Sequence, residues 1–369
     1  MNALTSPLLW QLGLVCALGF ALLWWLTLGA RRRGRRRGLM QRLRELAPHA
    51  NRAPGRSAAL LATLDRARQA MQAGLRTPRA RRLAIYRKPW FLVVDDGSGG
   101  ARPLLAAAQG QPAPGTPPTP NGADSPARAF WRWWLLEQMV AIEIDTVRAD
   151  TPQAQEAALD WYDALLALCT RRDRFPLDGI VLCLDAQTLA GDPGDLATIA
   201  KAMQRMVHSA SRHLRLRLPV YVVVHGLDTL GGYDLVRHLL PPEARTQAVG
   251  YRAPGDANVF ARMPGFDDVF APIAARLHSL RMALVRADSS APARHASHVF
   301  IEQVLGLEPG LRALIEQVFA PTLTSRPRWQ GLYFAAAPQQ AAQAAFVADL
   351  FTHLLPVDQA TARPRPPSR

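Results

Sequence analysis

Hydrophobic residues follow two patterns along most of this chain, and the two patterns alternate. Short, largely apolar runs lie at residues 90–94, 139–144, 180–184 and 219–224. Between these runs, apolar residues recur at helical spacing in residues 155–170 and 196–214. Strand-like runs that alternate with helical patterns predict an α/β fold, with a mainly parallel sheet and helices on both of its faces.

A third pattern is the uninterrupted apolar run at residues 8–28, in which only Gln11 and Thr27 are polar. Its length matches the roughly 20 residues that a helix needs to cross a bilayer. Six arginines follow within residues 31–37. A signal peptide would carry its positive charge before the apolar run, and arginines would not follow a buried core helix. The pattern therefore predicts one transmembrane helix, with the N-terminus outside the cytoplasm and the remainder inside it.

The net charge of +15 is concentrated in one segment. Residues 31–88 hold 18 Lys and Arg against Glu45 and Asp65, whereas the rest of the chain holds 26 basic and 27 acidic residues. A basic segment beside a predicted anchor is typical of a topology signal and of contact with anionic lipid head groups. Nucleic-acid binding is not favoured, because aromatic residues for base stacking are absent from this segment before Tyr86. The membrane is the expected partner.

Beyond the alternating region the composition changes. Residues 266–286, 298–319 and 341–355 have helical patterns with few β-branched runs, and residues 109–126 are rich in Pro, Gly, Ala and Gln, which predicts a mobile loop. The chain length allows one large domain or two smaller ones. We expect an anchor at 1–30, a basic juxtamembrane segment at 31–80, an α/β domain at 81–255, a helical subdomain at 256–355 and a disordered tail at 356–369.

A glycine-rich loop follows the first predicted strand and leads into an Ala/Leu segment. Its glycines are Gly97, Gly99 and Gly100. Strand, glycine loop and helix together form a phosphate-binding loop, but its motif G-x-x-x-x-G-K-[ST] also needs a lysine and a hydroxyl. If Gly100 is the second glycine, Asp95 replaces the first, Ala101 replaces the lysine and Arg102 replaces the hydroxyl residue. Asp95 and Asp96 would add two carboxylates near the phosphates. The loop is predicted to have lost its nucleotide.

Other catalytic or metal chemistry has little support. Cys16, Cys169 and Cys183 show no C-x-x-C spacing, which predicts free thiols rather than a disulfide or zinc site. The nine histidines show no metal-binding spacing. His225 near Asp228 is a candidate for hydrolase chemistry, but no nucleophile motif accompanies the pair. We assign no catalytic residue and no metal ligand.

Several segments together resemble a known family. They are Tyr86–Val94, Trp133–Trp134 followed by Glu143–Thr146, Leu177–Leu189, Leu218–Asp228 and Trp329–Phe334. In order and spacing they resemble the cytoplasmic region of TssM, or IcmF-like, membrane-complex proteins of type VI secretion, over about residues 80–355. The resemblance implies a domain similar to P-loop GTPases.

Three elements depart from the family pattern. Ala101 and Arg102 stand where the family has the lysine and threonine of the loop. The family's Asp-Thr-Ala-Gly element is Asp-Thr-Val-Arg in this chain, at Asp145–Arg148. The family's guanine-binding element Thr/Asn-Lys-x-Asp is His-Gly-Leu-Asp in this chain, at His225–Asp228. The vestigial nucleotide site is expected at Gly97, Gly99, Gly100, Arg102, Asp145 and Asp228. Loss of the lysine and the Mg²⁺ hydroxyl removes groups that neutralise phosphate charge.

The resemblance implies a shortened, non-catalytic inner-membrane component without a periplasmic domain and without a cofactor. Its partners would be a TssL-like inner-membrane protein, baseplate proteins or full-length TssM, docked on a pseudo-GTPase domain. The alternative is a membrane-anchored NTPase using GTP or ATP with Mg²⁺, in which Arg102 or a partner's arginine replaces the lysine.

Overall fold

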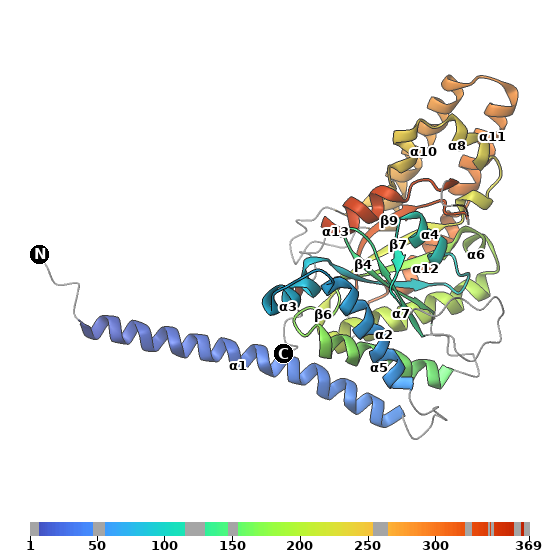
Figure 1. Ribbon diagram of the computed structural model, residues 1–369. Coiled ribbons are helices and arrows are strands. Elements are labelled where there is room, and N and C mark those ends of the chain that lie inside the picture. The colour runs from blue at the N-terminus through green and yellow to red at the C-terminus, as the bar shows by residue number, and fades with distance from the viewer. Residues whose placement is uncertain are drawn as a thin grey trace, which may run out of the picture.

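The computed structural model describes residues 7–46, 56–114, 130–146, 154–253, 265–321, 327–338, 340, 343–357 and 363–364. Within these ranges, the side chains at 7–9, 21, 23–32, 56–57, 82 and 363–364 lie outside the description. Figure 1 shows one sheet between helical layers, with helix α1 running along one side.

The strands of the main sheet are β1 (Trp90–Asp95), β2 (Gln111–Pro112), β3 (Trp131–Leu135), β4 (Val140–Asp145), β5 (Gly179–Asp185), β7 (Pro219–His225), β8 (Val249–Arg252) and β9 (Arg328–Phe334). Their spatial order is β2-β3-β4-β1-β5-β7-β9-β8. The central strands β4, β1, β5, β7 and β9 are parallel, and β2, β3 and β8 run antiparallel at the two edges. A small second sheet pairs β6 (Leu216–Arg217) with β10 (Arg363–Pro364). The predicted α/β fold is confirmed.

The helices are α1 (Pro7–Leu46), α2 (Arg56–Gln72), α3 (Pro78–Arg87), α4 (Ala101–Ala107), α5 (Ala154–Arg171), α6 (Ala186–Ala190), α7 (Pro193–Leu214), α8 (Tyr233–Leu239), α9 (Pro242–Thr246), α10 (Phe266–Ala287), α11 (Ala291–Leu305), α12 (Glu308–Val318) and α13 (Leu355–Val357). Short turns η2 (Leu227–Thr229) and η4 (Leu350–Leu354) complete the set. Several begin at a capping side chain followed by proline, as at Thr77, Asp192 and Ser290. Such a cap satisfies amides that the first helical turn leaves open, and proline there costs no hydrogen bond.

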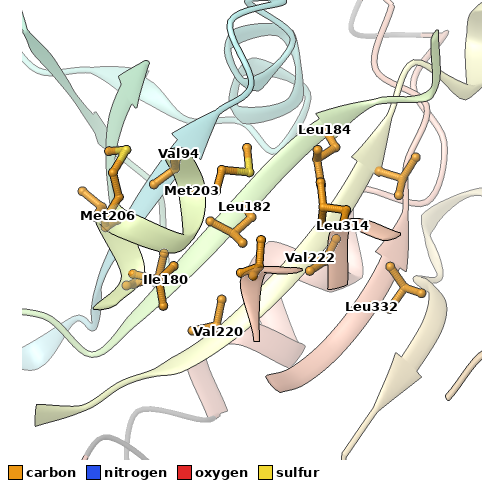
Figure 2. Close-up of a cluster of buried hydrophobic side chains, with 14 of the residues drawn as sticks. Val94, Ile180, Leu182, Leu184, Met203, Met206, Val220, Val222, Leu314 and Leu332 are labelled. Carbon is orange, nitrogen blue, oxygen red and sulfur yellow. The ribbon is translucent and has the colours of Figure 1, made fainter. Parts of the chain in front are cut away.

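One face of the sheet carries the larger core, under α2, α5, α7 and α12. Figure 2 shows the contact of strands with α7 and α12. It involves Val94, Ile180, Leu182, Leu184, Val220, Val222 and Leu332 of the strands with Met203, Met206 and Leu314 of the helices. Each such side chain contributes about 1.5–3 kcal/mol when fully buried. The central strands read as continuous apolar runs because both of their faces are covered.

The other face is covered by α4 and by the C-terminal turns η4 and α13. Leu104 and Leu105 of α4 and Phe351 of η4 belong to the same buried cluster as Phe91 and Tyr221 of the strands. The tryptophans of β3 are also buried, at Trp131, Trp133 and Trp134. These three side chains therefore pack in the core of the domain.

The segment after residue 255 contributes a strand as well as helices. β9 lies in the main sheet between β7 and β8. The helix expected at 298–319 is two helices, α11 and α12, divided at Gly306–Leu307. The predicted division at residue 255 stays a prediction. In the segment predicted as a mobile loop, Gln111–Pro112 form the edge strand β2, and residues 115–126 lie outside the described residues.

The N-terminal region combines a packed half and a projecting half. The C-terminal half of α1 packs on α5, with Leu39 fully buried, while its N-terminal half projects away from the rest of the molecule (Figure 1). Helix α2 lies within the basic segment, and its buried apolar residues Leu60, Leu64 and Ala67 face the core. No helix qualifies as a membrane span when the search is limited to what the structure describes. The span predicted at 8–28 stays a prediction, and most side chains of 21–28 lie outside the described residues.

The tail differs from its prediction at two residues. Arg363–Pro364 form β10 and pair with β6, although residues 356–369 were expected to be disordered. The neighbouring residues 358–362 and 365–369 lie outside the described residues.

Candidate functional site

The loop at residues 96–100 lies at the centre of the sheet. It leaves the carboxyl end of β1, which has β4 on one side and β5 on the other. The chain order of the strands reverses at this point. In open α/β sheets, ligands bind outside the carboxyl ends of the strands at such a reversal. The topology therefore places the glycine-rich loop where a nucleotide would be expected.

The interior of this loop is filled by the side chain of Asp95. Its fully buried carboxylate accepts hydrogen bonds from the amides of Gly97 at 3.1 Å, Gly99 at 2.8 Å and Ala101 at 2.9 Å. Gly97 and Gly99 have φ angles of 103° and 81°, which favour glycine and turn their amides inward. In a phosphate-binding loop, backbone amides of this kind hold the phosphate oxygens. Here they hold a carboxylate of the same chain.

Asp96 fastens the loop to the next strand. Its carboxylate is buried and accepts hydrogen bonds from the amides of Ser98 at 3.0 Å and Asp185 at 2.8 Å. Burial raises the pKa of Asp95, the charge of Asp96 raises it further, and the amides of Ala101 and Gly99 oppose both effects. Two adjacent buried carboxylates are thus held by backbone dipoles rather than by a lysine.

His225 closes the loop from the end of β7. A Cβ atom on Gly100 would lie 2.0 Å from Cε1 of His225, so the ring rests directly on that glycine. Ser98 Oγ lies 3.5 Å from Nε2 of the ring. Asp95, Asp96 and His225 each offer one ligand atom, all within 4.8 Å of one another, which makes them a possible cation group among the described residues. A cation there would compete for the carboxylate oxygens of Asp95 and Asp96 with the backbone amides that already donate hydrogen bonds to them.

Arg102 does not point its charge into the loop. Its Nε donates to Oε1 of Glu143 at 2.8 Å, and Oε2 of Glu143 accepts from the indole of Trp134 at 2.8 Å. Glu143 is buried in β4, and the guanidinium of Arg132 lies 3.8 Å from it. Arg102, which stands in for the loop lysine only in the alternative NTPase interpretation, is therefore an ion-pair partner of a strand residue.

The two predicted acids at neighbouring strand ends lie in different surroundings. Asp145 lies opposite Asp95 in the register of β4 and β1, and the amide and hydroxyl of Thr146 both donate to the carbonyl of Asp95. Asp228 lies in the turn after β7, where its Oδ1 accepts from the amide of Ala337 at 3.2 Å. Asp145 thus borders the loop, whereas Asp228 fastens the end of β9 to the turn.

The structure brings together the three predicted glycines and, beside them, Asp145. It directs Arg102 and Asp228 to other partners. Sequence reasoning missed Asp185, whose amide binds Asp96 and whose carboxylate caps α6 through Gln187. Its only signal was its place, directly after an apolar run.

Residues 154–368, more than half of the chain, match the model of the IcmF-related N-terminal domain. The chain belongs to the IcmF-related N-terminal domain family. Among curated proteins it is similar to the type VI secretion system component TssM1 of Pseudomonas aeruginosa strain PAO1, with 27% identity over 272 residues. That match covers 69% of this chain and 24% of TssM1, so the IcmF-related chain spans about a quarter of the relative's length.

Two solved structures were also matched. Both are the cytosolic domain of the T. maritima FeoB iron transporter in GDP forms, with 11% and 13% identity. Each match covers 63% of this chain and 96% or 93% of the FeoB chain, with a TM-score of 0.22. At this TM-score the likeness supports no structural argument for the IcmF-related domain.

At the opposite end of the sheet, two of the segments that carried the family resemblance meet. Arg172, almost fully buried, donates to Asp178 at 2.6 Å and to the carbonyl of Ile85 at 2.9 Å. Asp178 also accepts from the amide of Trp90 at 2.7 Å. The Arg172 guanidinium lies 5.3 Å and 5.0 Å from the ring centroids of Tyr86 and Trp90. Here the IcmF-related segments serve packing, and nothing in the sequence pattern had singled out Arg172.

Proposed function

We propose that this chain is a non-catalytic inner-membrane component of a type VI secretion system, with a P-loop-like domain that docks partners instead of hydrolysing nucleotide. The likeness to TssM1 supports the place in secretion. The bonding of Asp95 carries the non-catalytic part of the proposal. Three amides of the loop are already bound to its carboxylate.

A nucleotide would have to displace that carboxylate and then lie beside two acids. At about 4 Å, like charges repel by about 4 kcal/mol at the effective dielectric of a protein surface. The lysine that would offset this repulsion is replaced by the buried Ala101. Arg102 would have to leave Glu143, which is only 3% exposed and would keep only the more distant guanidinium of Arg132, at 3.8 Å, as an ion-pair partner. Electrostatics and packing both favour a loop that binds no phosphate.

The same proposal makes residues 8–28 an inner-membrane anchor with its N-terminus in the periplasm and the α/β domain in the cytoplasm. Support comes from the apolar run and from large apolar side chains of α1 that are exposed. They are Trp10, Leu12, Leu14, Val15, Leu18, Phe20 and Leu22. A TssL-like protein, baseplate proteins or full-length TssM are the proposed partners, on the basis of the TssM1 likeness.

The test is a thermal shift of the whole chain in detergent with Mg²⁺ and GTP, GDP, ATP or ADP at millimolar concentration. A ligand that binds the folded state must raise the melting temperature. At a concentration one hundred times its Kd, it adds about 2.7 kcal/mol to the free energy of unfolding. We expect no shift beyond that given by Mg²⁺ with inorganic triphosphate. A reproducible rise of several degrees with one nucleotide would overturn the empty-loop proposal in favour of an NTPase.

A further inference from the structure

Exposed arginines gather where α1 meets the domain. Arg37 of α1, Arg79 and Arg87 of α3, and Arg215 and Arg217 at β6 are all exposed. None of the five forms an ion pair within the parts of the chain that the structure describes. We name these five residues the arginine collar. The two acids of the basic segment do not neutralise it, since Glu45 pairs with Arg42 and Asp65 pairs with Arg171.

Direct contacts show that the elements of the collar converge on one stretch of α1. Arg35 of α1 donates to the carbonyl of Asp173, and Tyr86 of α3 donates to the carboxylate of the same residue at 2.9 Å. On the other side, a Cβ atom on Gly34 would lie 3.0 Å from the guanidinium of Arg215. Residues 34–35 of α1 therefore lie near β6 and, through Asp173, near α3.

This convergence is close to the end of the apolar run. Seven residues separate Leu28 from Arg35, which is about 10 Å along a helix. The polar head-group layer of a bilayer extends about 5–8 Å beyond the hydrocarbon on each side. Figure 1 shows α3 and β6 at the side of the domain from which the N-terminal half of α1 projects. If residues 8–28 cross the bilayer, the backbone of the collar lies just beyond the head-group layer, and its long arginine side chains can reach back to the lipid head groups.

The exposed stripe of α3 fits that position. Arg79, Leu83 and Arg87 are spaced at i, i+4 and i+8, which puts them on one side of the helix. Leu83 is 47% exposed between the two arginines, while Ala84 and Ile85 on the other side are buried. An apolar side chain between basic ones is typical of a helix that lies in the membrane interface.

We infer that the arginine collar binds anionic phospholipid head groups and holds α3 flat on the inner membrane. The inference rests on the proposed anchor, and it adds a second contact that fixes the orientation of the domain. Each arginine near an anionic surface contributes about 1 kcal/mol to binding. Removal of three of the five should therefore change the ratio of docked to undocked domain roughly a hundredfold.

The experiment places a fluorophore on α3 of the whole chain in lipid nanodiscs. Leu83→Cys takes the label, in a Cys16→Ser background, because Cys16 is exposed whereas Cys169 and Cys183 are buried. A nitroxide on the lipid head groups reports proximity by quenching. Discs contain phosphatidylcholine alone or with phosphatidylglycerol.

We expect strong quenching in the anionic discs, loss of that quenching in 1 M salt, and weak quenching in the neutral discs. The variant Arg79→Gln, Arg87→Gln, Arg215→Gln should lose the quenching with anionic lipid. A matched variant, Arg205→Gln, Arg286→Gln, Arg294→Gln, removes three exposed arginines elsewhere and should keep it.

The two proposals fail in different ways. A chain that does not remain with neutral discs contradicts the anchor, because the apolar run alone should hold it there. A chain that remains in the discs but shows no lipid-dependent quenching contradicts the collar alone. The lipid assignment would be overturned if the chain bound RNA or polyglutamate more tightly than anionic discs and the collar variant lost that binding.

Discussion

The two ends of the central sheet hold buried acids in different ways. At the carboxyl end, Asp95 and Asp96 are bound by backbone amides of the loop and of Asp185. At the amino end, Asp178 is bound by the guanidinium of Arg172. The first arrangement uses the groups that would bind a ligand, and the second joins helix α5 to two strands. An acid near a sheet end therefore indicates a ligand site only when the other groups of the protein leave its carboxylate without hydrogen-bond or ion-pair partners.

The buried acids at both ends have a raised pKa, which burial causes at Asp178 as well, whereas the pKa of a histidine on α7 is shifted in the opposite direction. At the carboxyl end, burial and Asp96 raise the pKa of Asp95, so its protonated form favours folding at low pH and that contribution is lost as pH rises through the raised pKa. On α7, burial and the charges of Arg212 and Arg42 lower the pKa of His213 to about 4. Its contribution has the opposite sign.

The largest expected effect comes from breaking the buried pair at the amino end. Arg172→Met leaves the carboxylate of Asp178 buried without its counter-charge, and we expect a loss of about 3–5 kcal/mol of unfolding free energy. Urea unfolding followed by circular dichroism measures it. The adjacent Arg171→Met is the control, because its ion pair with Asp65 is partly exposed and contributes under about 1 kcal/mol.

A double variant sharpens this prediction. Arg172→Met with Asp178→Leu removes both charges and should be more stable than Arg172→Met alone, since no unpaired carboxylate remains buried. If Arg172→Met costs no more than Arg171→Met, the pair does not hold the amino end together, and the contrast between the two ends fails.

A smaller effect is expected from acid titration of His213. The folded-state pKa of about 4 lies below the ordinary value of about 6.5. The stability that neutral His213 contributes is present above pH 6.5 and is lost as pH falls toward 4. After allowance for partial exposure, we expect about 1–3 kcal/mol of loss between pH 7 and 4.5.

The variant His213→Phe separates this titration from the others. It keeps an aromatic ring beside Tyr162, whose ring centroid lies 5.2 Å from that of His213, and it does not titrate. Unfolding free energies at several pH values should fall less steeply below pH 6.5 in this variant than in the parent chain. Equal slopes for His213→Phe and the parent would contradict the lowered pKa.

Much of the fold was predictable because its central strands are buried on both faces. Such strands must be apolar without interruption, and the runs at 90–94, 180–184 and 219–224 became β1, β5 and β7. The place of β9 among the parallel strands was not predictable from its own segment. Residues 328–334 join the sheet by pairing with β7, more than a hundred positions earlier, and no local pattern specifies that partner.

The candidate site was predictable as a loop but not as a set of bonds. Missing residue types indicated a lost nucleotide, because the lysine and hydroxyl of the motif are absent. That Asp95 fills the loop depends on where its carboxylate points, which is decided by the turn at Gly97 and Gly99. The partner of Arg102 is Glu143, 41 positions away across a strand pair. The hydrogen-bond partners of Asp95 and Arg102 therefore depend on the folded loop and on contacts between elements, which the sequence motif does not specify.

The smallest expected effect tests whether Asp95 occupies the place of a phosphate. Asp95→Ala leaves the amides of Gly97, Gly99 and Ala101 without their acceptor. Gly97 is exposed to water whereas Ala101 is buried, so we expect a cost of about 1–3 kcal/mol, that of one buried unsatisfied amide. Inorganic phosphate should then bind the opened amides and restore about 1 kcal/mol at several times its Kd, seen as a rise in melting temperature of the variant only. Asp228→Ala is the matched control, because its carboxylate accepts from the single amide of Ala337 and its removal opens no such cluster.

If phosphate stabilises the parent chain and Asp95→Ala equally, Asp95 does not occupy an anion site. The proposed loss of nucleotide binding would then rest on the missing lysine alone.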